Sequence, residues 1–122
     1  MLNPNTRNIA KLIIRIPVEF MRQSKSMHWL LKETTYFENY RAIGVDVIVE
    51  VLKEEPNYIE NWLQYSDDQR CIPAFYFKQN GIDDYIVDRY PSIPDYPKIH
   101  TSDKFEACAV FIKRYCEQIR VL

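Results

Sequence analysis

The chain of 122 residues contains only two glycines, Gly44 and Gly81. Phosphate-cradling loops, dinucleotide-binding fingerprints and nucleophile elbows need closely spaced glycines, so the sequence contains none of these motifs. The two histidines, His28 and His100, stand alone without a second ligand at metal-binding spacing. We interpret both as surface or packing residues, and we expect no metal site, no cofactor and no catalytic activity.

Long apolar runs are also missing. No run approaches the roughly 18 residues of a membrane-spanning helix, and the first twenty residues lack a small-residue cleavage site. We therefore expect a cytoplasmic protein without a membrane partner. The three cysteines, Cys71, Cys108 and Cys116, cannot all pair with one another, and we interpret them as reduced thiols.

The remaining pattern predicts an α+β fold in one domain, because a chain of this length can bury a sizeable core without disulfides or metal. The expected domain is mostly helical, with an antiparallel β-hairpin or small sheet that packs against a carboxy-terminal helix. The predicted ranges are 1–122 for the domain, 4–66 for its helical half, 71–122 for the rest, about 72–79 and 82–89 for the strands, and about 103–120 for the last helix.

The amino-terminal half carries apolar residues at helical spacing. Asn5 or Thr6 is the predicted cap of a first helix, and Pro17 should end or kink it. From Pro17 to about Lys32 we expect one kinked helix or two short helices, with Ser24 or Ser26 as the cap or break. The apolar stripe of this segment consists of Val18, Phe20, Met21, Met27, Leu30 and Leu31.

Residues 36–53 fit two templates, because their apolar residues match a helix while the valines of 45–51 alternate like a strand. A helix is favoured because the apolar spacing continues for eighteen residues, and a strand over 45–51 remains the alternative. Residues 56–66 then predict a short helix, followed by a polar link over 66–70.

Asn80-Gly81 lies between two runs rich in aromatic and β-branched residues, which predicts a hairpin with a type I′ turn. A two-residue loop would place Tyr76 opposite Tyr85, with Phe75, Phe77 and Ile86 on one face and Tyr76, Tyr85 and Val87 on the other. A three-residue loop with a bulge at Gly81, which shifts the register by one, is the alternative. The aromatic face should pack under the terminal helix, and the edge over 82–88 could pair with another chain.

The last helix has a clear beginning, because Asp103 and Glu106 have the spacing of a capping box. Phe105, Cys108 and Ile119 belong to its apolar side. Lys113 can pair with Glu117 one turn further on.

Charge is unevenly distributed along the chain. Residues 1–32 hold six Lys or Arg against one Glu, whereas residues 33–96 hold five against thirteen Asp or Glu, a net charge of −8. The middle of the chain should therefore attract a basic partner. Direct nucleic-acid binding by the basic first third is disfavoured, because its charges alternate with apolar residues as the wet side of amphipathic helices would.

Several stretches of the second half have a familiar pattern: Trp62-Leu-x-Tyr-Ser-x-Asp-x-Arg70, Phe75-Tyr-Phe77, Tyr85-Ile-Val-x-x-Tyr90 and Ala107-Cys-Ala-x-Phe-Ile-Lys113. Over about residues 60–115 the chain resembles small bacterial immunity proteins of contact-dependent growth inhibition and other polymorphic toxin systems. The resemblance implies a protein that binds a cognate toxin in the cytoplasm and blocks it. It implies no catalytic residue.

The expected partner is a basic toxin, for which a nuclease domain is one candidate, because acidic side chains can stand in for phosphates and speed the encounter. A non-catalytic adaptor and a nucleic-acid-associated accessory protein are the alternatives. The toxin's activity and the oligomeric state are left open by the sequence. The residues expected to contact the partner are Asp67, Asp68, Asp83, Asp84, Tyr85 and Asp88.

Overall fold

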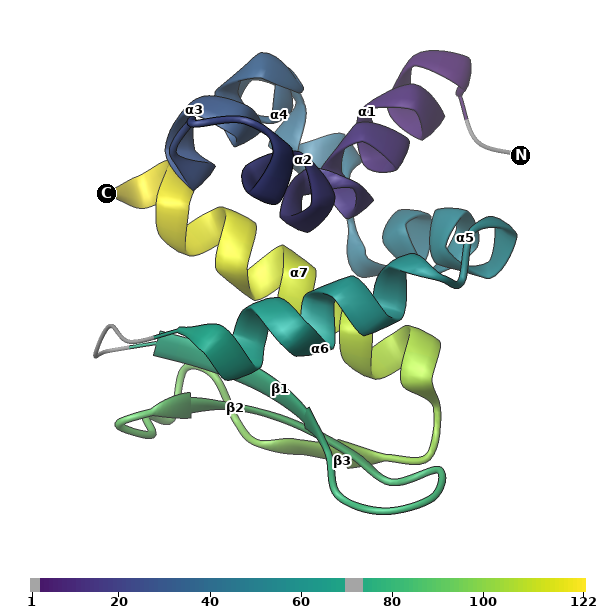
Figure 1. Ribbon diagram of the computed structural model, residues 1–122, viewed down its shortest axis with the longest axis vertical. Coiled ribbons are helices and arrows are strands. Elements are labelled where there is room, and N and C mark those ends of the chain that lie inside the picture. Colours follow the sequence, from purple (N-terminus) through teal and green to yellow (C-terminus); the bar gives the residue numbers. More distant parts are fainter. Residues whose placement is uncertain (1–2, 70–73) are drawn as a thin grey trace.

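The computed structural model describes residues 3–69 and 74–122. It has the α+β fold that the sequence predicts, with a three-stranded antiparallel sheet against helices. Helices α6 (Tyr58–Asp68) and α7 (Lys104–Val121) lie over one face of the sheet, and the amino-terminal helices lie on the other side of this pair (Figure 1). Helices α6 and α7 therefore separate the sheet from the first third of the chain.

The amino-terminal helices are short and begin at local capping signals. The side chain of Asn3 caps the first one by accepting a hydrogen bond from the N–H of Asn5 at 2.8 Å, so the predicted caps at Asn5 or Thr6 are wrong. Pro17 lies in the first turn of the second helix, where its missing N–H costs no hydrogen bond, and Ser26 caps the third as predicted. The bounds are α1 Pro4–Ile14, α2 Ile16–Arg22, α3 Met27–Glu33, α4 Tyr36–Asn39 and a 3₁₀ turn η1 at Tyr40–Ala42.

The ambiguous valine-rich segment is a helix, α5 (Val45–Glu54), as favoured from its apolar spacing. Val47, Ile48 and Val51 on one side of this helix are buried, which explains why the helical template outweighs β propensity there. Helix α6 continues through Asp68, whereas the sequence predicted a loop from residue 66. The last turn of α6 therefore carries two carboxylates, Asp67 and Asp68, that were expected on a polar link.

The sheet has the order β1-β2-β3, and its bounds are β1 Ala74–Gln79, β2 Tyr85–Tyr90 and β3 Ile99–Thr101. The predicted register is wrong, because Tyr76 lies opposite Asp88 rather than Tyr85. Val87 lies opposite Phe77, so Val87 and Tyr85 share the face that packs on α7. Residues 72 and 73 of the predicted first strand lie outside the described residues, as does Cys71.

The loop of the hairpin is longer than the predicted type I′ turn and than its three-residue alternative. It runs from Asn80 to Asp84, and the N–H of Asn80 donates to the carbonyl oxygen of Asp84 at 2.7 Å. Gly81 has a φ of 133° and Asp83 a φ of 51°, so both provide the positive φ that reverses the chain. The burial of Tyr85 and Val87 therefore determines the length of the loop, and the preference of Asn80-Gly81 for a two-residue turn is not met.

The hydrophobic core extends from the sheet past α7 to α1, α3 and α5, and the aromatic face of the hairpin packs on α7 as expected. The rings of Phe77 and Phe111 are 5.8 Å apart, and Cys108 and Cys116 are buried free thiols on the same helix. Asp103 caps α7 by accepting hydrogen bonds from the N–H groups of Phe105 and Glu106. The run that carries the resemblance is part of this core, since Ala107, Cys108, Ala109, Phe111 and Ile112 are all fully buried.

The expected exposed edge over 82–88 is wrong, because β2 is the central strand. Strand β1 is an edge strand, and α6 covers part of that edge. The hydroxyl of Ser66 accepts a hydrogen bond from the N–H of Phe77 at 2.8 Å, and the side-chain amide of Gln69 donates to the carbonyl oxygen of Phe75 at 3.0 Å. Helix α6 thus occupies backbone groups with which another strand would pair.

Candidate functional site

The six residues expected to contact a partner do not form one surface. Asp67 and Asp68 are exposed on the last turn of α6, beside the beginning of β1. Asp83 is exposed and Asp84 half-buried in the loop after the other end of β1. Figure 1 shows this separation, because α6 ends at one side of the sheet and the β1–β2 loop lies at the opposite side. The predicted acidic surface is therefore divided into two.

Tyr85 does not lie on an exposed face. Its side chain is 6% exposed and belongs to the core, and its ring lies 6.1 Å from that of Phe77. Burial raises the pKa of the Tyr85 phenol, and the nearby carboxylates of Asp83 and Glu60 raise it further. The prediction that Tyr85 shares an outer face with Tyr76 is wrong because the register differs.

Asp88 is buried as well, with 8% of its surface exposed. Its carboxylate accepts hydrogen bonds from the N–H of Arg89 at 2.8 Å and from the hydroxyls of Tyr76 and Ser92, each at 3.4 Å. These contacts join β1, β2 and the segment after β2. Asp88 is placed to hold this corner of the sheet together rather than to meet a partner.

Asp84 also has contacts within the protein. Its carboxylate contacts Nε2 of His100 on β3 and accepts a hydrogen bond from the side-chain amide of Asn80 at 3.3 Å. These contacts fix the hairpin loop against the third strand. Asp67, Asp68 and Asp83 are the three predicted contact residues whose side chains are exposed.

Sequence reasoning missed Glu60, an exposed residue in the first turn of α6. Glu60 and Asp83 come together around Tyr85, although they are far apart in the sequence. A groove of about 450 Å³ runs between α6 and β1, and Glu60, Asp67 and Lys78 are among the residues that line it. Only the antiparallel packing of α6 on β1 reveals this groove, since nothing in the spacing of the carboxylates indicates it.

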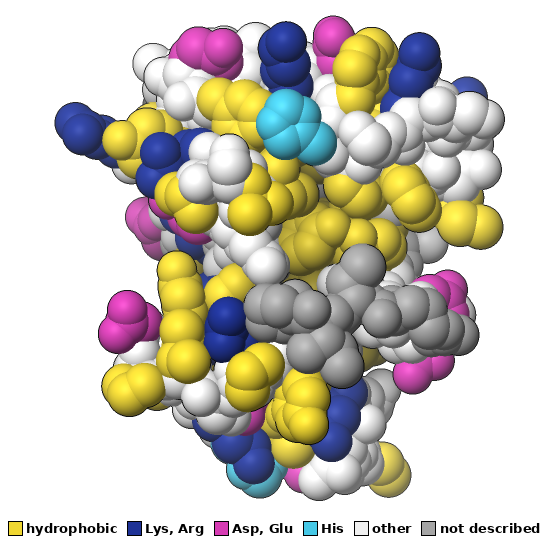
Figure 2. Space-filling model, turned by 90° about the vertical axis from the view of Figure 1, so that its left-hand side faces the viewer, with side chains coloured by type: hydrophobic (Ala, Val, Ile, Leu, Met, Phe, Trp, Pro, Cys, Tyr) yellow, Lys and Arg dark blue, Asp and Glu magenta, His cyan; other side chains and the backbone are white. Residues whose placement is uncertain are grey.

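A larger pocket, of about 680 Å³, lies between α2, α6 and α7 on the other side of α6. We refer to it as the α2–α6 pocket. Figure 2, which faces the side of Figure 1 where the carboxyl terminus lies, shows hydrophobic side chains in a hollow at mid-height. The volume falls within the range of about 300–1,000 Å³ that is typical of ligand sites.

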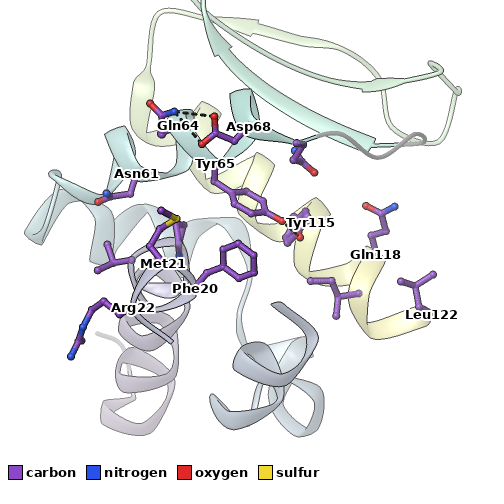
Figure 3. Close-up of a pocket in the computed structure, with 14 residues that line it drawn as sticks. Phe20, Met21, Arg22, Asn61, Gln64, Tyr65, Asp68, Tyr115, Gln118 and Leu122 are labelled. Carbon is purple, nitrogen blue, oxygen red and sulfur yellow. Dashed lines mark hydrogen bonds between the residues drawn. The ribbon is translucent and has the colours of Figure 1, made fainter. Parts of the chain in front are cut away.

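The two walls of this pocket differ in chemistry (Figure 3). Helix α2 contributes Pro17, Val18, Phe20 and Met21, whereas α6 contributes Asn61, Gln64 and Asp68. Between the walls lie Tyr65 and Tyr115, whose hydroxyls are hydrogen-bonded to each other, and Phe20 meets the ring of Tyr65 edge-on at 6.0 Å. The pocket is therefore apolar along α2 and polar along α6.

The apolar wall was not foreseen as a surface. Phe20 and Met21 belong to the predicted apolar stripe, but they are 37% and 82% exposed, while Met27, Leu30 and Leu31 are buried. The reason is that α2 and α3 are separate helices, so the stripe does not continue on one face. A large exposed Met beside aromatic rings is a feature of adaptable binding surfaces.

Three of the six cations in the basic first third of the chain pair with carboxylates at the end of α5. Arg7 and Lys11 both approach Glu54, Lys11 at 3.9 Å, and Arg15 pairs with Glu55 at 3.1 Å. The charge asymmetry of the sequence is thus partly compensated inside the fold. The carboxylates at 54 and 55 belong to these pairs rather than to an acidic docking surface.

A second cluster of charged groups joins α7 to α4 and η1. Lys113 donates hydrogen bonds to the hydroxyl of Tyr36 and the carbonyl oxygen of Tyr40, both at 2.8 Å, and Arg120 pairs with Glu117 at 2.8 Å. Burial lowers the pKa of Lys113, whereas the hydrogen bond from Arg120 is the main cause that lowers the pKa of Glu117. None of these groups lines the groove or the α2–α6 pocket. The cluster connects α7 with α4 and η1 and belongs to neither cavity.

Within residues 3–69 and 74–122 no group of three or more His, Cys, Asp or Glu is arranged to hold a metal ion. In the same ranges no helix is long and apolar enough to cross a membrane. Comparisons with protein-family models, with curated proteins and with solved structures found no match to this chain.

Proposed function

We propose that the protein binds a cognate bacterial toxin and neutralises it by contact, without catalysis, in the cytoplasm. The observation that carries the proposal is the exposed last turn of α6, where Asp68 lines a pocket with an apolar wall on α2 and Asp67 lines the groove on the other side of α6. Carboxylates speed the encounter with a basic protein, and a neighbouring apolar pocket slows its dissociation. The acidic turn of α6 and the apolar wall of α2 supply these two parts of a tight protein interface.

The resemblance to immunity proteins involves residues of the core more than residues of the contact surface. Its residues, such as Trp62, Phe77 and Phe111, are buried, so they specify the core. The exposed residues of α2 and α6 are not part of the shared pattern, apart from Asp68. This division suits proteins that keep one scaffold and match their surface to one partner, because specificity requires contacts that differ between partners.

The ion pairs of α1 favour this function over a nucleic-acid-associated role. Arg7, Lys11 and Arg15 have carboxylate partners at the carboxy-terminal end of α5, so a phosphate backbone would have to compete with Glu54 and Glu55. An adaptor that uses the same surface without neutralising anything remains the second candidate. Growth in the presence of the toxin separates the two.

Co-expression tests the proposal. The carboxy-terminal domain of a toxin encoded directly upstream should arrest growth alone, and the chain should restore growth and co-purify with that domain. Co-purification without restored growth would favour the adaptor. A lack of both would contradict toxin binding. Fractionation of the cells checks the cytoplasmic location.

A further inference from the structure

The α2–α6 pocket has a polar wall with helical regularity. Asn61, Gln64 and Asp68 are separated by three and four residues, so they project from one side of α6. The facing wall, with Phe20 and Met21 on α2, is apolar. An amphipathic occupant matches both walls, because a wholly apolar ligand would leave the polar side chains of Asn61 and Asp68 facing apolar groups.

The charge at this rim specifies the occupant further. The guanidinium of Arg22 pairs with Glu19 at 2.9 Å. The carboxylate of Asp68, four residues beyond Gln64, lines the pocket and is exposed to solvent. Gln64 itself donates to both oxygens of Asp68 at 3.1 Å. Among the described residues that line the pocket, Asp68 carries the one carboxylate side chain and Arg22 the one guanidinium. A lysine or arginine of the occupant is the complementary group beside Asp68.

The walls also specify the backbone of the occupant. All the lining residues lie on or next to helices α2, α6 and α7, so no strand edge is available for an extended peptide to join. A groove between helices receives another helix, which places its apolar residues at intervals of three and four. The volume of about 680 Å³ has room for more than one side chain.

We propose that the α2–α6 pocket receives an amphipathic helix of the bound toxin, with the apolar side of that helix on Phe20 and Met21 and a basic residue beside Asp68. This inference rests on the proposed function. It adds the place, the secondary structure and the charge of the segment that is recognised.

The test uses the purified chain and the toxin domain encoded directly upstream. Met21→Glu should raise the Kd at least about tenfold, because it places a charge on the apolar wall. Leu12→Glu is the matched control, since Leu12 is 48% exposed on α1 and lies outside the pocket. Circular dichroism should show that both variants are folded.

A Met21→Cys variant that carries a photo-crosslinker identifies the occupant directly. The expected product joins position 21 to a toxin segment that is helical in the complex and carries Lys or Arg. Equal Kd values for the Met21→Glu variant and its control would overturn the pocket inference while leaving toxin binding intact. Cross-links to an extended segment or to a second copy of this chain would also overturn it. A wild-type chain that binds no toxin would overturn both proposals.

Discussion

The hydroxyl of Ser66 on α6 accepts a hydrogen bond from the backbone N–H of Phe77 on β1 at 2.8 Å. Both residues are buried, and the bond occupies a backbone donor on the outer edge of the sheet. It fixes the end of α6 that carries Asp67 and Asp68 relative to the sheet. One serine thus closes a strand edge and positions the acidic turn.

Replacement of Ser66 by alanine should lower the free energy of unfolding by about 1–3 kcal/mol, because the N–H of Phe77 would lose its partner in a buried site. Urea denaturation measures the difference. Ser24→Ala, at an exposed position, should change stability by less than about 0.5 kcal/mol. Equal stability of the two variants would show that the hydrogen bond contributes nothing.

Asp88 should act on stability and not on binding. Asp88→Ala removes the acceptor of Tyr76, Ser92 and the N–H of Arg89, and should cost about 1–3 kcal/mol in urea denaturation. Asp95→Ala, at an exposed position, is the control and should be nearly neutral. The Kd of the folded Asp88→Ala variant for the toxin should equal that of the wild type. A weaker complex would show that Asp88 contributes to the contact with the toxin.

Glu117 should contribute an acid-sensitive part of the stability. Because Arg120 holds the pKa of Glu117 below its ordinary value of 4.5, the folded chain binds this proton less tightly than the unfolded chain does. The contribution is complete above that ordinary value and is lost as the pH falls through the lower folded-state pKa.

Glu117→Gln should therefore lower the free energy of unfolding at pH 7 and make its decline toward pH 3 shallower than in the wild type. Urea denaturation across this pH range gives both quantities. Glu33→Gln, at an exposed position, is the control. Parallel curves for the wild type and Glu117→Gln would contradict the assignment.

The buried thiols should react only when the chain opens. Burial raises the pKa of Cys108 and raises that of Cys116 to about 12, so neither is a thiolate at pH 8. In a Cys71→Ser variant of the folded protein, a disulfide reagent such as DTNB should label the two buried thiols only as fast as the protein opens. In urea the same reagent should label both thiols at once. Rapid labelling of the folded variant would contradict their burial.

The sequence predicted the structure correctly where a local signal and the burial of apolar side chains favour the same conformation. The cap at Asp103, the apolar side of the last helix and the pair of Lys113 with Glu117 are all present. It failed at the hairpin register, because Asn80-Gly81 favours a two-residue turn while Tyr85 and Val87 must face α7. The longer loop lets Tyr85 and Val87 face α7, although Asn80-Gly81 then does not form a two-residue turn.

The candidate site was harder to predict, since it depends on contacts between distant segments. Asp67 and Asp68 are exposed as expected, but Tyr85 and Asp88 are buried by a register that the turn does not specify. Ser26 predicts the break between α2 and α3, but the sequence does not show that this break leaves Met21 exposed.

The measurement that tests the central proposal most directly is the Kd of the purified chain for the upstream-encoded toxin domain, with Asp67 and Asp68 both replaced by lysine. Lysines in the last turn of a helix suit its dipole, so the variant should fold. Glu50→Lys, an exposed reversal on α5, is the control. Near 50 mM salt the double variant should bind at least about tenfold more weakly than the wild type and the control, and the difference should shrink near 500 mM because salt screens exposed charges. A double variant that binds as tightly as the wild type at low salt would contradict recognition through α6.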